Sequence, residues 1–119
     1  MRALATAVAA AALLAGCGSS PLPQPAGSIK IVMTEFKYAP STIEAPNGKV
    51  VFYLVNSGTV AHNLIIRDSA NRRLKTSELV SAGDVSVFTV DNIAAGTYSF
   101  FCDQQGHEAS GMKGTLTIT

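Results

Sequence analysis

Short stretches of alternating or clustered apolar residues run along most of the chain, and they predict strands. From Ser28 onward we expect strands at these positions: residues 29–36, 49–56, 62–66, 84–90, 96–102 and 114–119. Turn signals such as Pro46-Asn47-Gly48 separate them. No stretch from residue 28 on keeps an apolar period of about 3.6 residues over three turns, and residues 72–80, a weak helical candidate, are expected to be irregular. The pattern therefore favours an all-β fold, an antiparallel sandwich or a small barrel.

The N-terminal segment differs from the rest of the chain. Arg2 precedes an apolar run from Ala3 to Ala15, which is shorter than the roughly 20 residues of a membrane-spanning helix. The run ends in Leu14-Ala15-Gly16-Cys17, which resembles the lipobox of bacterial lipoproteins, where the cysteine is lipidated and becomes the first residue. We expect a lipoprotein signal peptide over residues 1–16. An ordinary signal peptide with a stray cysteine is the alternative.

This interpretation sets the expected domain organisation and location. Cys17 is the predicted lipidation site. Residues 17–28 consist of this cysteine and a linker that is rich in glycine, serine and proline, a composition typical of flexible spacers. Residues 29–119 form one domain. Several acyl chains on one cysteine exceed the two signals that stable membrane anchoring requires. We therefore expect an exported protein that is anchored to a bacterial membrane and faces the periplasm or the outer surface.

Composition removes several classes of function. The chain has 119 residues, which suits one compact domain, and its formal net charge is only +1 with 14% charged residues. Neither a basic patch typical of nucleic-acid binding nor a glycine-rich phosphate loop is present. We expect no nucleic-acid partner, and a monomer is the default.

The candidate chemistry lies near the C-terminus, between Cys102 and Met112. Alternation along the preceding strand places Cys102 on the same face as Phe100, so its thiol should point inward. The chain has two cysteines and two histidines; if Cys17 is acylated, Cys102 has no disulfide partner. An unpaired thiol in an oxidising compartment requires burial or a metal. A thiolate, two imidazoles and a thioether are the ligands of a type 1 copper site, and here the candidates are His62, Cys102, His107 and Met112.

These residues stand in segments that resemble the cupredoxins, the family of small blue copper proteins. The similarity lies in GTYSFFC at 96–102, GH at 106–107, GMKGTLTIT at 111–119 and the upstream His62-Asn63, and it is greatest to auracyanin-like and plastocyanin-like members. The resemblance implies a Greek-key β-sandwich that holds one type 1 copper ion. It implies an electron carrier, not an enzyme, which works between a redox protein donor and acceptor such as a cytochrome, an oxidase or a photosynthetic complex.

The resemblance also assigns roles to residues around the site. The histidine of the C-terminal loop, here His107, would reach the surface and provide the electron's exit. Asn63 would link the His62 loop to the Cys102 loop, and Phe101 should point outward. The apolar residues expected around His107 are Ala39, Pro40 and Val60.

Other interpretations remain open. Taken singly, His62 could be an ordinary histidine at a strand start, Met112 core filler, and Asn63 a turn residue. A periplasmic copper-binding carrier or chaperone could use the same residues, although it would usually expose several methionines or histidines. Zinc is a third option, against which a methionine ligand argues. A cysteine nucleophile would need an accessible thiolate, whereas Cys102 is expected to point inward.

Overall fold

The structure, a computed structural model, describes residues 21–119. The signal peptide predicted over residues 1–16 and the lipidation site Cys17 lie outside the described residues. Within residues 21–119 the chain forms strands and no helix. They are β1 (Ile29–Thr34), β2 (Lys37–Ala39), β3 (Thr42–Ala45), β4 (Gly48–Asn56), β5 (Ile65–Arg67), β6 (Arg73–Thr76), β7 (Val85–Ile93), β8 (Gly96–Phe101) and β9 (Lys113–Ile118).

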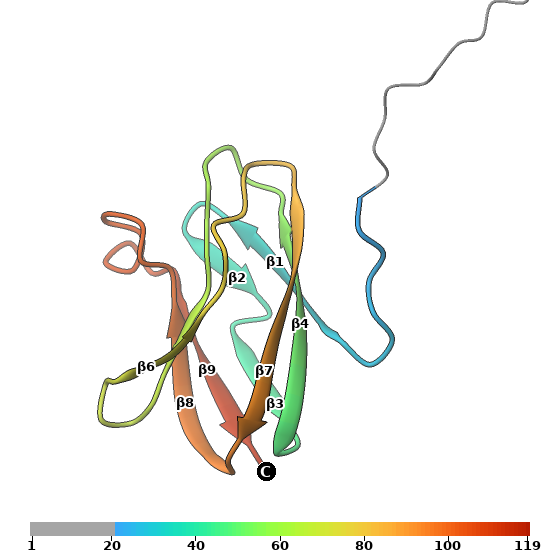
Figure 1. The fold of residues 1–119 in the computed structure, drawn as a ribbon. Helices are drawn as coiled ribbons and strands as arrows, with labels where there is room; N and C mark the ends of the chain where they lie inside the picture. Colours follow the sequence, from blue (N-terminus) through green and yellow to red (C-terminus); the bar gives the residue numbers. More distant parts are fainter. Residues whose placement is uncertain (1–20) are drawn as a thin grey trace, which may run out of the picture.

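The strands form the two layers of a β-sandwich, as predicted (Figure 1). One sheet has the order β2-β1-β4-β7 and the other the order β3-β9-β8-β5-β6. The expected antiparallel arrangement is only partly correct, because β1 pairs with β4 and β3 with β9 in parallel. The chain leaves the first sheet after β2 to form β3 and returns with β4, a crossover that lets β1 and β4 run side by side in the same direction.

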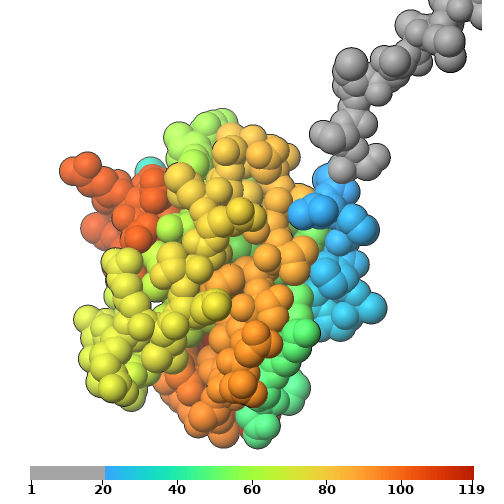
Figure 2. All heavy atoms as spheres, viewed as in Figure 1, coloured from blue at the N-terminus to red at the C-terminus, as the bar shows by residue number. Residues whose placement is uncertain are grey.

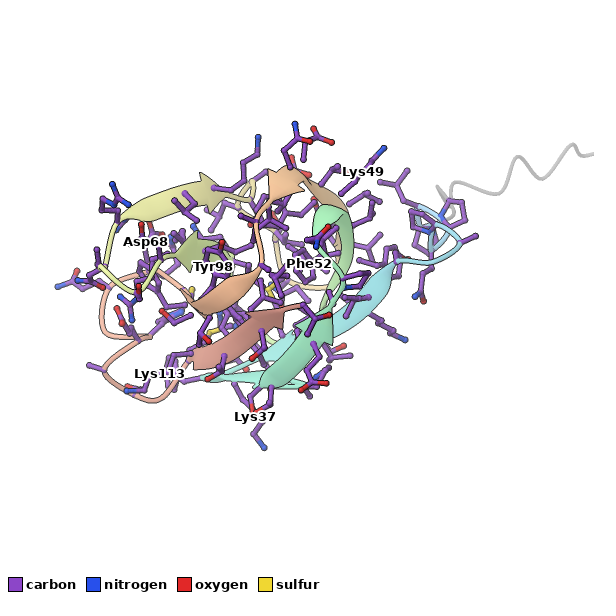
Figure 3. All side chains as sticks on the ribbon, turned by 90° about the horizontal axis from the view of Figure 1, so that it is seen from below. Lys37, Lys49, Phe52, Asp68, Tyr98 and Lys113 are labelled. Carbon is purple, nitrogen blue, oxygen red and sulfur yellow. The ribbon has the colours of Figure 1, made fainter. Side chains whose placement is uncertain are left out.

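The core fills the space between the two sheets. Strand β4 places Val50, Phe52 and Leu54 in the core, and β8 and β9 contribute Phe100 and Leu116 from the other layer. Figure 3 shows Phe52 between the layers, whereas Lys37 and Lys113 project from the periphery. All members of this core lie between residues 31 and 118, so the sandwich holds its own core and we expect it to fold by itself.

Three short strands depart from the sequence-based expectation. Strands β2 and β3 were not predicted, and β6 lies in the segment expected to be irregular. All residues of β6 are exposed, so no apolar alternation marks it, and pairing with β5 at the sheet edge creates the strand. The strand expected over residues 62–66 begins only at Ile65, and His62 forms an isolated bridge with Val80.

Residues 21–28, which belong to the predicted linker, contact the domain before β1. The hydroxyl of Tyr53, in β4, donates a hydrogen bond to the carbonyl of Leu22. Within the segment, the backbone N–H of Ser28 donates to the carbonyl of Pro25 at 3.1 Å. Figure 2 shows this blue segment lying against the body of the molecule. None of the described residues forms a helix of the length and apolarity that a membrane crossing requires.

Candidate metal centre

The connection between β8 and β9, residues 102–112, presents three of the four predicted ligands. Cys102 directly follows β8, and the loop then brings His107 and Met112 back toward it. The N–H of Met112 donates to the carbonyl of His107 at 3.0 Å, and the N–H of Cys102 donates to the carbonyl of Met112 at 3.2 Å. Gly106 and Gly111 have φ angles of 80° and 107°, a backbone region that side chains other than glycine rarely adopt. Backbone hydrogen bonds therefore hold the loop in one compact shape.

His62 lies in the connection between β4 and β5, and its backbone pairs with Val80 in the connection between β6 and β7. Its N–H and C=O pair with those of Val80 at 3.1 and 2.8 Å. The buried side chain of Asn56 donates to the carbonyls of Val60 and Val80 at 2.8 and 2.9 Å. These bonds join the connection between β4 and β5 to the connection between β6 and β7, so the imidazole is attached to a well-supported backbone.

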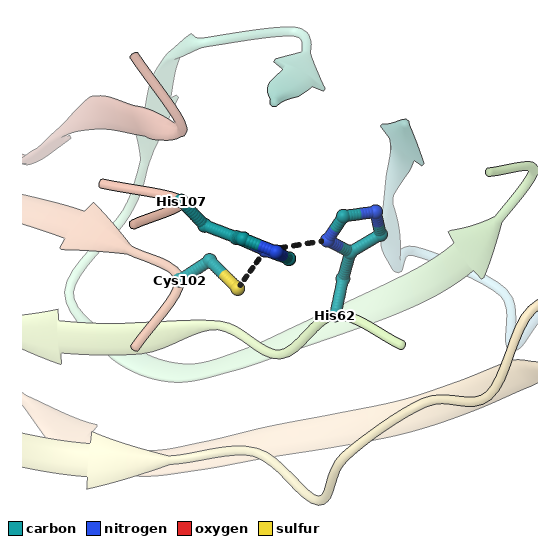
Figure 4. Close-up of side chains that lie close together, drawn as sticks. All are labelled: His62, Cys102 and His107. Carbon is teal, nitrogen blue, oxygen red and sulfur yellow. Dashed lines mark hydrogen bonds between the residues drawn. The ribbon is translucent and has the colours of Figure 1, made fainter. Parts of the chain in front are cut away.

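Three of the predicted ligand side chains converge at this end of the sandwich (Figure 4). The Nδ1 atoms of His62 and His107 lie 3.2 Å apart, and the Sγ of Cys102 lies 3.4 Å from Nδ1 of His107. The three candidate ligand atoms all lie within 4.8 Å of one another. Zinc binds nitrogen and sulfur at about 2.0–2.3 Å, so two donors to one such ion lie within roughly 4.6 Å of each other. The separations of 3.2 and 3.4 Å lie inside this limit. The spacing and the donor types fit a single metal ion.

Burial differs among the four predicted ligands. His62, Cys102 and Met112 are completely buried, whereas His107 is half-buried. Burial and the neighbouring His62 both lower the pKa of His107, which favours the neutral imidazole that a metal needs. Three donors are thus shielded from water, and one reaches the surface.

Asn63 connects the two segments that carry the candidate ligands. Its Nδ2 donates to Oδ1 of Asp103 at 2.7 Å, and its Oδ1 accepts from the backbone N–H of Asp103 at 3.1 Å. The bond from Asn63, with a further one from Arg73, lowers the pKa of Asp103. The buried hydroxyl of Tyr38 donates to the carbonyl of Asn63 at 2.6 Å. The side chain of Asn63 therefore joins the His62 loop to the Cys102 loop, which is the position expected from the sequence.

Glu35, in the turn between β1 and β2, was missed by the sequence analysis. Its Oε1 lies 3.2 Å from Nε2 of His62 and accepts the backbone N–H groups of Thr59 and Val60 at 2.7 and 3.1 Å. The two backbone donors, followed by His62, lower the pKa of Glu35 to about 2, so the group is a carboxylate at neutral pH. Its sequence separation from His62 is 27 residues, and no local signal could have found it.

The surroundings of His107 and Phe101 also differ from expectation. The ring of Phe36, which was not predicted, meets His107 edge to face at a centroid distance of 4.9 Å. Val60, which was predicted, is exposed, as are Ala39 and Pro40. Phe101 points away from the core between the sheets, as expected, since the core contains its neighbours Phe100 and Cys102 but not Phe101. Its ring is nevertheless buried, because the guanidinium of Arg67 covers it at 4.2 Å from the ring centroid.

Comparison with known proteins agrees with this fold and site. A family model of the cupredoxin-like domain matches residues 4–118, and the chain therefore belongs to the cupredoxin-like family. Plastocyanin from Scenedesmus fuscus is 28% identical over 86 residues, which cover 68% of this chain and 85% of that protein.

Two auracyanins are also similar to the chain. Auracyanin-B from Chloroflexus aurantiacus is 41% identical over 46 residues, or 39% of this chain, but the matched segment spans only 20% of that protein's length. The structure of a dithionite-reduced auracyanin from Roseiflexus castenholzii superposes with a TM-score of 0.68 at 22% identity, covering 77% of this chain and 96% of that chain. Cupredoxins bind one type 1 copper ion, and family members are copper electron carriers.

Proposed function

We propose that the protein is a blue copper electron carrier whose type 1 copper is bound by His62, Cys102, His107 and Met112. The observation that carries this proposal is the convergence of the Cys102 thiol and two imidazole nitrogens within 4.8 Å. A thiolate and a thioether favour Cu(I), whereas imidazoles suit both oxidation states. Bound copper supplies a one-electron Cu(I)/Cu(II) couple.

The chain's own residues would keep such a site dry and rigid. Cys102 and Met112 are completely buried, so water is kept from the thiolate. The hydrogen bonds of Asn63 and Asn56 hold the loops that carry the ligands. A site that changes little when an electron arrives costs little reorganisation, which suits electron transfer better than catalysis.

His107 is the proposed exit for the electron because it alone among the four reaches the surface. Phe36 and Val60, 40% and 43% exposed, give this end an apolar surface. We infer that redox partners, such as a cytochrome, an oxidase or a photosynthetic complex, bind to this apolar surface. We also infer that the protein is a monomer when they bind. A His107→Gly variant should bind added imidazole and regain the blue colour. Absence of rescue would argue that His107 is not a ligand.

Copper titration of the metal-free protein tests the proposed site. Cu(II) should produce an intense red-absorbing thiolate band and an EPR spectrum with narrow copper hyperfine splitting. Cys102→Ser keeps the size of the side chain and should lose the band. A colourless product from the unmodified protein, or a pale one with ordinary tetragonal copper signals, would instead support the copper-carrier or the zinc interpretation.

Electron exchange and copper release, measured on the copper-loaded protein, separate an electron carrier from a copper carrier or chaperone. A copper carrier must release its metal, whereas three of the four proposed ligands are buried. We therefore expect a blue site that exchanges electrons quickly and yields copper slowly to an added chelator. Rapid loss of copper with slow electron exchange would favour the copper carrier.

Membrane anchoring is a separate proposal that rests on the sequence Leu14-Ala15-Gly16-Cys17. We infer removal of residues 1–16, lipidation of Cys17, and exposure of the domain over residues 29–119 to the periplasm or the outer surface. Mass spectrometry of the processed N-terminus in a bacterial host should show an acylated Cys17. The Cys17→Ser variant should leave the membrane fraction. An unmodified Cys17 in the mature protein would contradict this proposal.

A further inference from the structure

The two ring nitrogens of His62 have different neighbours. Nδ1 faces Nδ1 of His107 at 3.2 Å, toward the proposed copper site. Nε2 faces away from it, toward Oε1 of Glu35, also at 3.2 Å. His62 is completely buried, and the side chain of Glu35 is 31% exposed. The carboxylate therefore closes the outer side of an imidazole that water does not reach.

This contact determines where the proton of His62 sits. An ionised carboxylate only accepts hydrogen bonds, so Nε2 of a neutral imidazole must carry the hydrogen, which leaves the lone pair of Nδ1 for a metal. A carboxylate bonded to the outer nitrogen of a ligating histidine also makes that histidine a stronger donor. Cu(II) carries more charge than Cu(I), so a stronger donor and a nearby negative charge both favour the oxidised ion.

The fold gives the carboxylate a fixed place. Oε1 accepts the N–H groups of Thr59 and Val60 in addition to its contact with His62. At Gly58 a Cβ atom would overlap the carboxylate of Glu35, so the missing side chain of the glycine leaves the space that Glu35 occupies. The carboxylate thus belongs to the structure of this loop and is not a mobile surface group.

We propose that Glu35 is a positioning residue that holds His62 in the Nε2–H tautomer and lowers the reduction potential of the site by favouring Cu(II). The inference rests on the proposed copper site for its second part only. The tautomer of His62 is a property of the metal-free protein and is tested without copper.

The first experiment uses NMR to measure the chemical shifts of the ring nitrogens of the two histidines in the metal-free protein at pH 8. His62 should show a single tautomer with its hydrogen on Nε2. Glu35→Ala removes the acceptor and should give a mixture of tautomers. Glu35→Gln keeps an oxygen that accepts from Thr59, Val60 and Nε2, so it should retain the loop and the tautomer. An unchanged single tautomer in Glu35→Ala would overturn the positioning role.

The second experiment measures the reduction potential of the copper-loaded Glu35→Gln variant. Loss of the charge should shift the relative affinity for Cu(I) over Cu(II) by roughly tenfold, a rise of about 59 mV for a one-electron couple. Glu108→Gln is the matched control, since Glu108 lies in the copper loop but bonds to Arg67 and not to a histidine. A shift no larger than that of the control would overturn the effect on potential. Failure to form a blue site in the unmodified protein would instead overturn the proposed function, and the NMR result would still decide the tautomer.

Discussion

The link between the two ligand-bearing loops predicts a measurable loss of stability in an Asn63→Ala variant. The substitution removes both hydrogen bonds to Asp103, at 2.7 and 3.1 Å. Asn63 is 6% exposed, so water does not readily replace its bonds. The Asp103 side chain is 28% exposed and regains some hydration, which reduces the cost.

The magnitude follows from the two bonds. A hydrogen bond to a charged group contributes about 1.5–3 kcal/mol and one between neutral groups about 0.5–1.5 kcal/mol. Rehydration of Asp103 favours the lower half of their sum, so the free energy of unfolding should fall by about 2–3 kcal/mol. With a urea dependence of about 2 kcal/mol per molar, the unfolding midpoint should move down by roughly 1–1.5 M.

Urea unfolding of the metal-free protein measures this change without a contribution from copper. Asn47→Ala, at an exposed position in the turn between β3 and β4, is the matched control and should cost no more than about 0.5 kcal/mol. Asn63→Asp places a second carboxylate against Asp103; it should be destabilised at pH 7 and recover as the pH falls and one of the pair is protonated. Equal effects of Asn63→Ala and Asn47→Ala would refute the reasoning.

Three further predictions concern the proposed ligand Met112, the packing of β9 and an acidic turn. Met112→Leu should keep the blue band but raise the reduction potential, because the thioether donor that tunes the potential is lost. The control Met33→Leu, in the core, should leave the potential unchanged. Equal potentials in both variants would count against Met112 as a ligand. Gly114→Ala should lower the free energy of unfolding by about 1–3 kcal/mol, because the added Cβ would overlap both the Phe100 ring and the backbone carbonyl of Ser41. An unchanged urea midpoint would show that the ring and the Ser41 backbone can both move aside. Hydrogen bonds, chiefly from the backbone N–H of residue 72, lower the pKa of Asp68 in the folded protein. The carboxylate therefore stabilises the fold above its unfolded pKa of about 3.9. This contribution disappears as the pH falls through the folded pKa. Asp68→Asn should therefore be less stable than wild type at pH 7 in urea unfolding, and the difference should shrink as the pH falls below the unfolded pKa. A pH-independent difference would contradict this role.

Much of the candidate site could be predicted from the sequence because its residues are close in the chain. Cys102, His107 and Met112 lie on one loop, and their types and spacing are local properties. His62 could be included because the chain has only two histidines, and the structure brings its ring next to that of His107. Whether these side chains bind copper stays a prediction for the titration described above.

The amino-acid pattern alone predicts β4, which is a run of β-branched and aromatic residues. It also predicts β8, where Tyr98 and Phe100 alternate with other residues at the period of two expected for a half-buried strand. It could not determine that β1 and β4 run parallel, or that the exposed residues of β6 form a strand, because pairing across a sheet depends on crossovers and neighbouring strands. Only the tertiary structure placed Glu35 beside Nε2 of His62 and Arg67 over the ring of Phe101. Such contacts join distant segments, so their partners are chosen by the packing of the two sheets and leave no pattern along the chain.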